Sequence, residues 1–359
     1  MEPLKNKFNN DLIFKIQKLI KANDSSFIHI KFKKEIINKL DSLEMKDRVK
    51  LISHQLNECL PNRYLQNIKV LKKILRNKDP HGLEGFEVWP IAQYVEDYGL
   101  EYPKQSLAFL KQITGVFTAE FSIRPFIHTN EELVFSTLEK WKYDKSEHVR
   151  RLVSEGTRPN LPWGSKLEVI NNNLDRNLGL VLSLVNDPSP YVRKSVANHL
   201  NDISKLNIDL FFKSIESIKD SDEKTKWVIR HASRTLLKNG NLKALKVHGY
   251  SLRETFTGTL KINKLRVKEN EKFELKVELN SKNSKSKKIL IEYKVYFVKK
   301  NGISPKIFRF KDTKMNKDLT LTKNIAIKNV TVRKNYTGEH KIEILVNGNI
   351  IARNKIILI

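Results

Sequence analysis

The chain has 359 residues, more than one hydrophobic core usually organises, so its length favours two domains. Lysine and arginine number 67 against 40 aspartates and glutamates, and the net charge of +27 favours a polyanionic partner, nucleic acid or an anionic membrane surface. The sequence lacks an apolar run long enough to span a membrane and any secretory signal, and its single cysteine, Cys59, excludes an internal disulfide and a cysteine-rich zinc site. We therefore expect a cytoplasmic protein.

The positive charge has two interpretations. Lysine, asparagine and isoleucine are all abundant, as they are in proteins from AT-rich genomes, so part of the lysine excess follows from codon usage. The arginines are better evidence for a functional charge because they recur in one part of the chain, at Arg150, Arg151, Arg158, Arg193, Arg230 and Arg234.

Residues 1–250 have a helical pattern. Segments such as 11–20 (DLIFKIQKLI) and 34–40 (KEIINKL) repeat apolar residues every three or four positions. Proline and glycine interrupt the pattern only briefly, as at 79–82 and 187–188, so they mark turns between helices. We predict an all-helical domain over 1–250.

The helical region contains an internal repeat. Residues 144–153 (DKSEHVRRLV) align with 187–196 (DPSPYVRKSV) at an offset of 43, and a degenerate third copy starts with the acidic residue of 222–230 (DEKTKWVIR). A period of this length is typical of HEAT repeats, so we predict a HEAT-like α-solenoid.

The repeat predicts where the basic residues point. In each copy an Asp or Ser begins the helix, a valine packs into the stack, and the next residues project from the surface. Aligned copies would form a concave basic ridge that follows a phosphate backbone. The alternative is that these arginines pair with neighbouring acids such as Glu147, Glu155 and Asp202. The predicted DNA-binding residues of the helical region are Arg150, Arg151, Arg158, Arg193, Lys194, Arg230 and Arg234.

Residues 251–359 alternate apolar and polar positions, as in 272–279 (KFELKVEL), 289–298 (ILIEYKVYFV) and 340–346 (HKIEILV). About seven such segments predict a small all-β immunoglobulin-like sandwich without a disulfide, and a fibronectin-like topology fits equally well. This region holds 26 lysines and arginines against 10 acids. We also predict that Lys285 and Lys287, in the basic loop 281–288, enter or straddle a DNA groove; the alternative is a solvated loop.

The most distinctive stretch, 155–163 (EGTRPNLPW), breaks a helix with two prolines and ends on an aromatic residue. Together with 117–125 (FTAEFSIRP) upstream and 196–202 (VANHLND) downstream, it resembles the AlkC-type DNA alkylation-repair glycosylases, some of which carry an immunoglobulin-like C-terminal domain. The chain departs from the family pattern at Asn160, where a basic residue is expected.

The resemblance implies excision of cationic alkylated bases, such as 3-methyladenine and 3-methylcytosine, by hydrolysis of the N-glycosidic bond and without flipping the base into a pocket. It assigns the catalytic positions to Glu120, Glu155, Trp163 and Asp202. The chemistry suits these residues. A cationic base leaves as a neutral molecule and needs no general acid, so ionised carboxylates serve to stabilise the oxocarbenium ion and to orient water. An aromatic ring favours the charged lesion.

Each of these residues also has a structural explanation. Glu155 follows Arg151 by four positions and Glu120 precedes Arg124 by four, the spacing of helical ion pairs. Asp202 has the alternative role of a local cap or pair, and Trp163 that of a plug in the solenoid.

The sequence pattern thus predicts a mainly α protein, and the resemblance implies that it acts as a monofunctional DNA glycosylase. We expect a monomer that binds double-stranded DNA with alkylated bases, needs no cofactor or metal, does not bind membranes, and associates with the bacterial nucleoid. Two alternatives stay open: a non-catalytic HEAT-repeat scaffold that binds nucleic acid, and a protein-interaction scaffold whose charge reflects genome composition.

Overall fold

A computed structural model describes residues 3–61, 63–218, 222–252, 255–329 and 334–359. The chain forms two compact units that part between Ala232 and Ser233. The change from helix to strand lies further on, because the last helix, α16, spans Leu242–Val247 and the first strand, β1, spans Phe256–Ile262. Two short helices, α15 (Arg234–Lys238) and α16, therefore belong with the strands.

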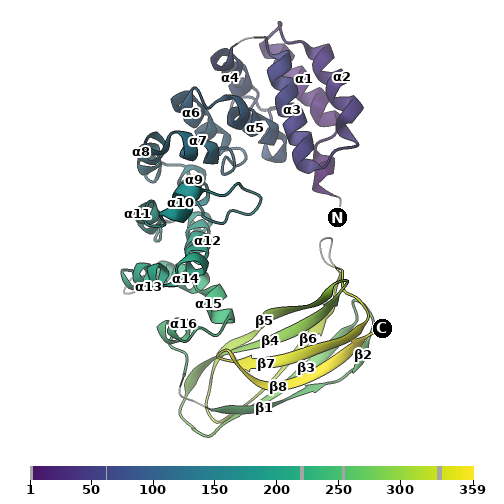
Figure 1. Ribbon diagram of the computed structural model, residues 1–359, viewed down its shortest axis with the longest axis vertical. Coiled ribbons are helices and arrows are strands. Elements are labelled where there is room, and N and C mark those ends of the chain that lie inside the picture. The colour runs from purple at the N-terminus through teal and green to yellow at the C-terminus, as the bar shows by residue number, and fades with distance from the viewer. Residues whose placement is uncertain (1–2, 62, 219–221, 253–254, 330–333) are drawn as a thin grey trace. The chain divides into compact units, whose positions relative to one another are not determined.

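The first unit is a stack of α-helices (Figure 1). Its helices are α1 (Asn10–Asn23), α2 (His29–Leu40), α3 (Met45–Cys59), α4 (Tyr64–Lys73), α5 (Trp89–Tyr98), α6 (Pro103–Ile113), α7 (Arg124–Thr129), α8 (Glu131–Trp141), α9 (Glu147–Glu155), α10 (Glu168–Asn172), α11 (Leu178–Ser183), α12 (Pro190–Leu206), α13 (Ile208–Glu216) and α14 (Glu223–Ala232), with short 3-10 helices η1 (Leu4–Lys7) and η2 (Gly85–Val88). Among the described residues, none of the helices combines the length and the apolar character that crossing a membrane requires.

Helix α1 shows how the sequence pattern determines the packing. Its buried residues, Leu12, Ile13, Ile16 and Ile20, are spaced by three and four and so form one face. The side chain of Asn9 accepts a hydrogen bond from the Leu12 amide at 3.1 Å and caps the first turn. The helix predicted over 11–20 is confirmed.

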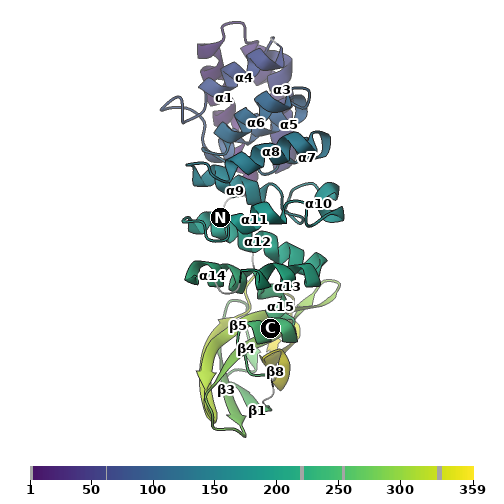
Figure 2. The same ribbon diagram turned by 90° about the vertical axis from the view of Figure 1, so that its left-hand side faces the viewer.

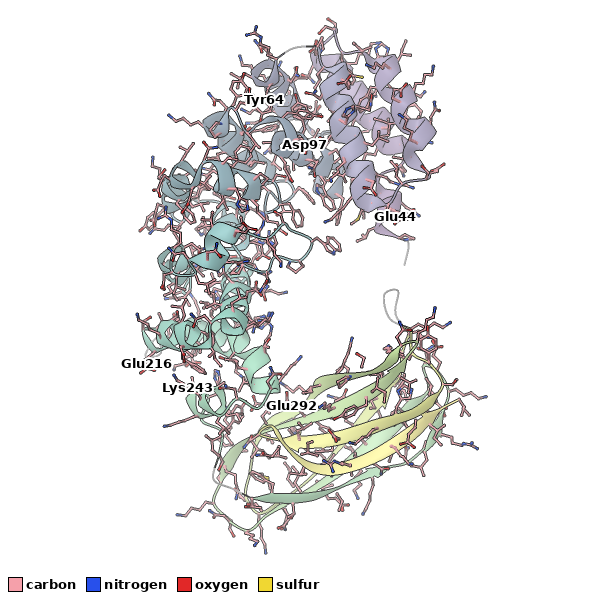
Figure 3. The ribbon with its side chains drawn as sticks, in the orientation of Figure 1. Glu44, Tyr64, Asp97, Glu216, Lys243 and Glu292 are labelled. Carbon is pink, nitrogen blue, oxygen red and sulfur yellow. The ribbon has the colours of Figure 1, made fainter. Side chains whose placement is uncertain are left out.

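Polar contacts fix the register between neighbouring helices in the first half of the unit. The Ser53 hydroxyl of α3 donates to Asp97 of α5 at 2.7 Å, and the Tyr64 hydroxyl of α4 lies 2.7 Å from that of Ser106 on α6 (Figure 3). Helices α3 and α5 therefore pack directly against each other, which matters because both contribute to the pockets described below.

The internal repeat corresponds to helices α9, α12 and α14, and α12 packs against both of the others. Figure 2 shows these helices in successive layers. The repeated aspartates have the same role at an offset of 43: Asp144 accepts a hydrogen bond from the Ser146 amide, and Asp187 accepts one from the Ser189 amide, each at 2.8 Å. The predicted solenoid of helical repeats is confirmed.

The repeated arginines behave differently from the prediction that they project from the surface. Arg150 donates to the carbonyls of Asp144 and Lys145, and Arg193 donates to those of Asp187 and Pro188. Each guanidinium thus folds back on the turn before its own helix, because the last carbonyls of that turn need donors.

The second unit is a two-layered β-sandwich whose strands are β1, β2 (Arg266–Val267), β3 (Lys272–Ser281), β4 (Lys287–Lys299), β5 (Gly302–Met315), β6 (Asp318–Ala326), β7 (Gly338–Val346) and β8 (Asn349–Leu358). One sheet has the order β1-β3-β6 and the other β2-β8-β7-β4-β5 (Figure 1). Alternating residues such as Phe273, Leu275 and Val277 fill the core between them. The predicted immunoglobulin-like sandwich is confirmed.

Candidate active site

The loop of residues 156–167 leaves the helical stack after α9 ends at Glu155 (Figure 1). Pro159 and Pro162 prevent the helix from continuing. Arg124, which is fully buried, holds both ends of the loop: it donates to the carbonyls of Gly156 at 3.0 Å, Arg158 at 2.9 Å, and Ser165 at 2.9 and 2.5 Å. Burial and the nearby charge of Arg158 lower the pKa of Arg124 to about 10, so it remains charged at neutral pH.

Trp163 lies in this loop with 57% of its surface exposed. Its backbone has φ +67°, a left-handed conformation that residues other than glycine rarely adopt. Lys46 of α3 donates to its carbonyl at 2.8 Å. The indole is therefore presented to solvent by a strained and tethered backbone, and it does not plug the solenoid.

Glu155 is buried, and both of its carboxylate oxygens are bonded. Arg158 donates to Oε1 at 2.7 Å, Ser195 of α12 donates to Oε2 at 2.6 Å, and Arg151 lies 3.7 Å from Oε1. Burial alone would raise the pKa of Glu155, but the charges of Arg151 and Arg158 and the Ser195 hydroxyl outweigh it and hold the pKa below its ordinary value. The carboxylate is therefore ionised at neutral pH.

Glu120, in the turn before α7, lies beside the same arginine. Its Oε2 is 2.6 Å from Arg151 Nη1 and accepts a hydrogen bond from the Thr118 hydroxyl at 2.6 Å. The guanidinium of Arg151 also lies over the ring of Tyr191, 4.9 Å from its centroid. The helical pair expected between Glu120 and Arg124 is thus replaced by a pair with Arg151, since Arg124 bonds to backbone carbonyls.

Asp202 of α12 has only 2% of its side chain exposed. It accepts a hydrogen bond from Arg158 Nε at 2.9 Å and lies 3.4 Å from the ammonium of Lys205. Arg158 is therefore held between two buried carboxylates, Glu155 and Asp202.

A pocket of about 310 Å³ opens beside these carboxylates, and we call it the acidic pocket. Glu120, Glu155, Arg158 and Trp163 line it, whereas Asp202 does not. The rest of the wall is largely aromatic: the ring of Trp89 stacks on Phe121 at 5.6 Å and lies 6.2 Å from Phe117, and Phe86 lies 5.7 Å from Phe117. The full set of lining residues is Phe86, Trp89, Phe117, Thr118, Glu120, Phe121, Glu155, Arg158, Leu161, Pro162 and Trp163.

The predicted DNA-binding residues differ in their surroundings. Arg150 pairs with Asp187 at 2.6 Å, Lys194 is exposed, and Arg230 and Arg234 are partly exposed. In the β-sandwich, Lys285 is exposed, but Lys287 is buried, and its ammonium donates to the Ser281 hydroxyl at 2.6 Å and to the Asn283 carbonyl. Lys287 therefore closes its own loop instead of reaching outward.

Sequence reasoning missed the aromatic wall and the roles of Ser195 and Arg124. Phe86 and Trp89 are distant from the distinctive motif in the sequence, and an aromatic residue at helical spacing predicts only a core position. Across the described parts of the chain, no three His, Cys, Asp or Glu side chains gather as metal ligands would. Two carboxylates, each paired with an arginine, thus face an aromatic wall, an arrangement whose chemistry suits a cationic group.

Comparison with known proteins identifies this architecture. Residues 115–236 match the family model described as DNA alkylation repair enzyme, and residues 257–359 match that of the C-terminal Ig-like domain of the uncharacterised protein YhaZ. The chain is 34% identical to the uncharacterized protein YhaZ of Bacillus subtilis (strain 168), over 98% of both chains. It is 30% identical to Pseudomonas fluorescens alkylpurine DNA glycosylase AlkC bound to DNA containing an abasic site analog, over the whole of both chains, with a TM-score of 0.91.

The fold is thus that of a helical-repeat protein of DNA alkylation repair. The chain belongs to the AlkC-type family of DNA alkylation-repair glycosylases, with an immunoglobulin-like C-terminal domain.

Proposed function

We propose that this protein excises cationic alkylated bases, 3-methyladenine and 3-methylcytosine among them, from double-stranded DNA by hydrolysing the N-glycosidic bond. The observation that carries the proposal is the ionised, buried carboxylate of Glu155 beside Glu120 in the aromatic-walled acidic pocket. The relative whose structure is solved with DNA is an alkylpurine DNA glycosylase, which supports the same reaction class.

The carboxylates suit the charge that develops during this reaction. The alkylated base departs as a neutral molecule, and positive charge moves to the deoxyribose. A carboxylate about 4 Å from that charge attracts it by roughly 4 kcal/mol at an effective dielectric constant near 20, before desolvation is counted. Because its neighbours hold Glu155 in place and ionised, little reorganisation is needed as the transition state forms.

The contacts of the two glutamates suggest different roles. Both oxygens of Glu155 are bonded within the protein, so we assign it to electrostatic stabilisation of the oxocarbenium ion. Glu120 meets Arg151 and Thr118 through Oε2, and we assign its Oε1 to the attacking water. Trp163 packs against the sugar or the lesion, and Asp202 acts through Arg158, whose guanidinium it holds.

The remaining predictions concern how the DNA is held. The protein acts as a monomer and a monofunctional enzyme, and it reaches the lesion in opened DNA without flipping the base. The exposed indole of Trp163 at the acidic pocket is accessible to DNA that stays outside the protein. Exposed cations such as Lys194 and Lys285 neutralise phosphates. Binding should therefore weaken steeply between about 50 and 200 mM salt.

The decisive experiment measures release of 3-methyladenine and 3-methylcytosine from alkylated duplex DNA by the wild type, by Glu155→Gln and Glu120→Gln, and by Glu139→Gln. Glu139 is an exposed acid paired with Lys142 on the solenoid surface and serves as the control. We expect release by the wild type and the control and a large loss in the two pocket variants. If the pure wild-type protein binds DNA but releases no base, the non-catalytic scaffold that binds nucleic acid becomes the supported alternative. DNA binding whose affinity does not change with salt concentration would point instead to a protein-interaction scaffold.

A further inference from the structure

A second pocket of about 190 Å³ lies beside the acidic pocket, between α3, α5 and the loop that carries Trp163. We call it the α3–α5 pocket. Three aromatic side chains, Trp89, Phe121 and Trp163, line both pockets. The other lining residues of the α3–α5 pocket are Lys46, Val49, Lys50, Gln93, Glu96, Gly164 and Ser165.

The polar groups of this pocket differ from those of its neighbour. Two lysines one turn apart on α3, Lys46 and Lys50, line it; Lys46 donates to the Trp163 carbonyl, and Lys50 is exposed. On α5 the pocket is lined by Gln93 and by Glu96, whose pKa is raised by burial and by the nearby Asp97. The acidic pocket presents two carboxylates held by arginines, whereas this one presents an exposed ammonium beside aromatic rings.

The shared indole limits how far apart two bound groups lie. Groups that occupy the two pockets and both touch Trp163 are separated by about the dimensions of one ring. Successive nucleotides of one DNA strand rise by about 3.4 Å. A lesion whose deoxyribose meets the carboxylates of the acidic pocket therefore brings the next nucleotide of the same strand to the α3–α5 pocket.

We propose that the α3–α5 pocket binds the nucleotide that flanks the lesion on the damaged strand. Lys50 contacts its phosphate, and the rings of Trp163 and Phe121 pack against its sugar or base. Aromatic packing of this kind tolerates any sequence, as an enzyme that searches for damage requires. The proposal rests on the proposed function, because it places the deoxyribose of the lesion against the acidic pocket.

The test uses binding to an uncleavable duplex that contains one abasic site analogue, with single phosphates replaced by neutral methylphosphonates. The protein variants are Lys50→Met, Lys50→Arg and, as a matched control, Lys104→Met, which removes an exposed lysine on α6. We expect Lys50→Met to weaken binding about three- to tenfold and to reduce the slope of log K against log salt by about 0.9, the value for one phosphate contact. Lys50→Arg should restore the slope, and Lys104→Met should leave it unchanged.

The decisive result is coupling between the protein and the DNA. A methylphosphonate at one of the two phosphates flanking the abasic site should weaken the wild type and the control but not Lys50→Met. The proposal is overturned if, at both flanking phosphates, the methylphosphonate weakens Lys50→Met by the same factor as it weakens the wild type. It is also overturned if free 3-methyladenine competes with the duplex and Glu96→Gln abolishes that competition, because the pocket would then hold the released base. This binding experiment does not depend on base excision. A failure of excision alone would therefore count against the proposed function and not against the binding of the flanking nucleotide.

Discussion

Each of the two units buries a glutamate among two cations and a hydroxyl, and the glutamate of the helical unit lines the acidic pocket. Glu155 meets Arg158, Arg151 and Ser195 in the helical unit. Glu343 of β7 meets Lys341 at 2.7 Å, Arg353 at 3.2 Å and the Tyr296 hydroxyl at 2.8 Å. In both, burial opposes ionisation, but the partners outweigh it, so the pKa lies below its ordinary value.

The cations around the two carboxylates differ. Arg151 and Arg158 have 14% and 8% of their side chains exposed, whereas Lys341 and Arg353 have 45% and 63%. The cations at Glu155 are largely buried and the carboxylate lines the acidic pocket, whereas the cations at Glu343 are exposed to solvent. Pairing therefore does not distinguish a site from a structural contact. The enclosure of the cations and the adjacent pocket do.

The largest effect on stability should come from removing the enclosed cation. Arg158→Ala leaves Glu155 and Asp202 buried without their shared partner, which should lower the free energy of unfolding by about 3–5 kcal/mol. Arg353→Ala removes an exposed partner and should change it by less than about 1 kcal/mol. Urea unfolding of both variants measures the difference. Equal losses would contradict the distinction drawn between the two clusters.

The largest effect on activity should come from changing a carboxylate that lines the acidic pocket. Glu155→Gln keeps the shape of the side chain but removes its charge, and we expect the single-turnover excision rate to fall by about 10²–10³-fold. Glu343→Gln alters a buried carboxylate that is not among the residues lining the acidic pocket and should leave that rate within about twofold of the wild type. A comparable loss of excision in both variants would show that the cause is general destabilisation.

Acid should weaken the helical unit through His199, which is fully buried on α12 and lies 3.0 Å from the Ser154 carbonyl. Burial lowers its pKa to about 4, against about 6.5 when unfolded. Above pH 6.5 both states are neutral and the stabilisation is complete. As the pH falls from 6.5 toward 4 only the unfolded state gains the proton, so up to about 3 kcal/mol is lost. In His199→Gln the unfolding free energy should depend less on pH in this window, and an unchanged dependence would exclude the assignment.

The smallest effect should come from Asn160, which is exposed in the loop next to Arg158. Asn160→Lys adds a cation beside the acidic pocket without disturbing the buried cluster. We expect DNA binding to tighten a few-fold and the salt slope to steepen by about 0.9, as for one added phosphate contact. The same substitution at Asn173, in the turn after α10, is the control, and an equal gain there would indicate a nonspecific charge effect.

The repeating patterns made the fold predictable. The three- and four-residue spacing of Leu12, Ile16 and Ile20, the 43-residue repeat and the alternation in β3 each determine which face of an element is buried. The sequence also brought Glu120, Glu155 and Trp163 into one motif set, and the structure places all three around one pocket. Their catalytic roles stay predictions.

The partners of the charged residues could not be predicted in the same way, because they depend on contacts between segments far apart in the chain. Arg124 precedes the carbonyls that it holds by 32 to 41 positions, and Arg158 reaches Asp202 across 44. Likewise, the spacing of Lys285 and Lys287 gave no sign that only one of them would be exposed. Local sequence shows that a charge is present but not which donors and acceptors the fold brings to it.

The left-handed backbone at Trp163 has an evolutionary consequence. Glycine adopts this conformation without strain, whereas an L-residue loses about 1–2 kcal/mol there. At this position, selection for a stable fold and selection for an exposed indole therefore act in opposite directions. Variants selected only for folding should accumulate glycine at position 163, and variants selected for survival of alkylation should keep tryptophan.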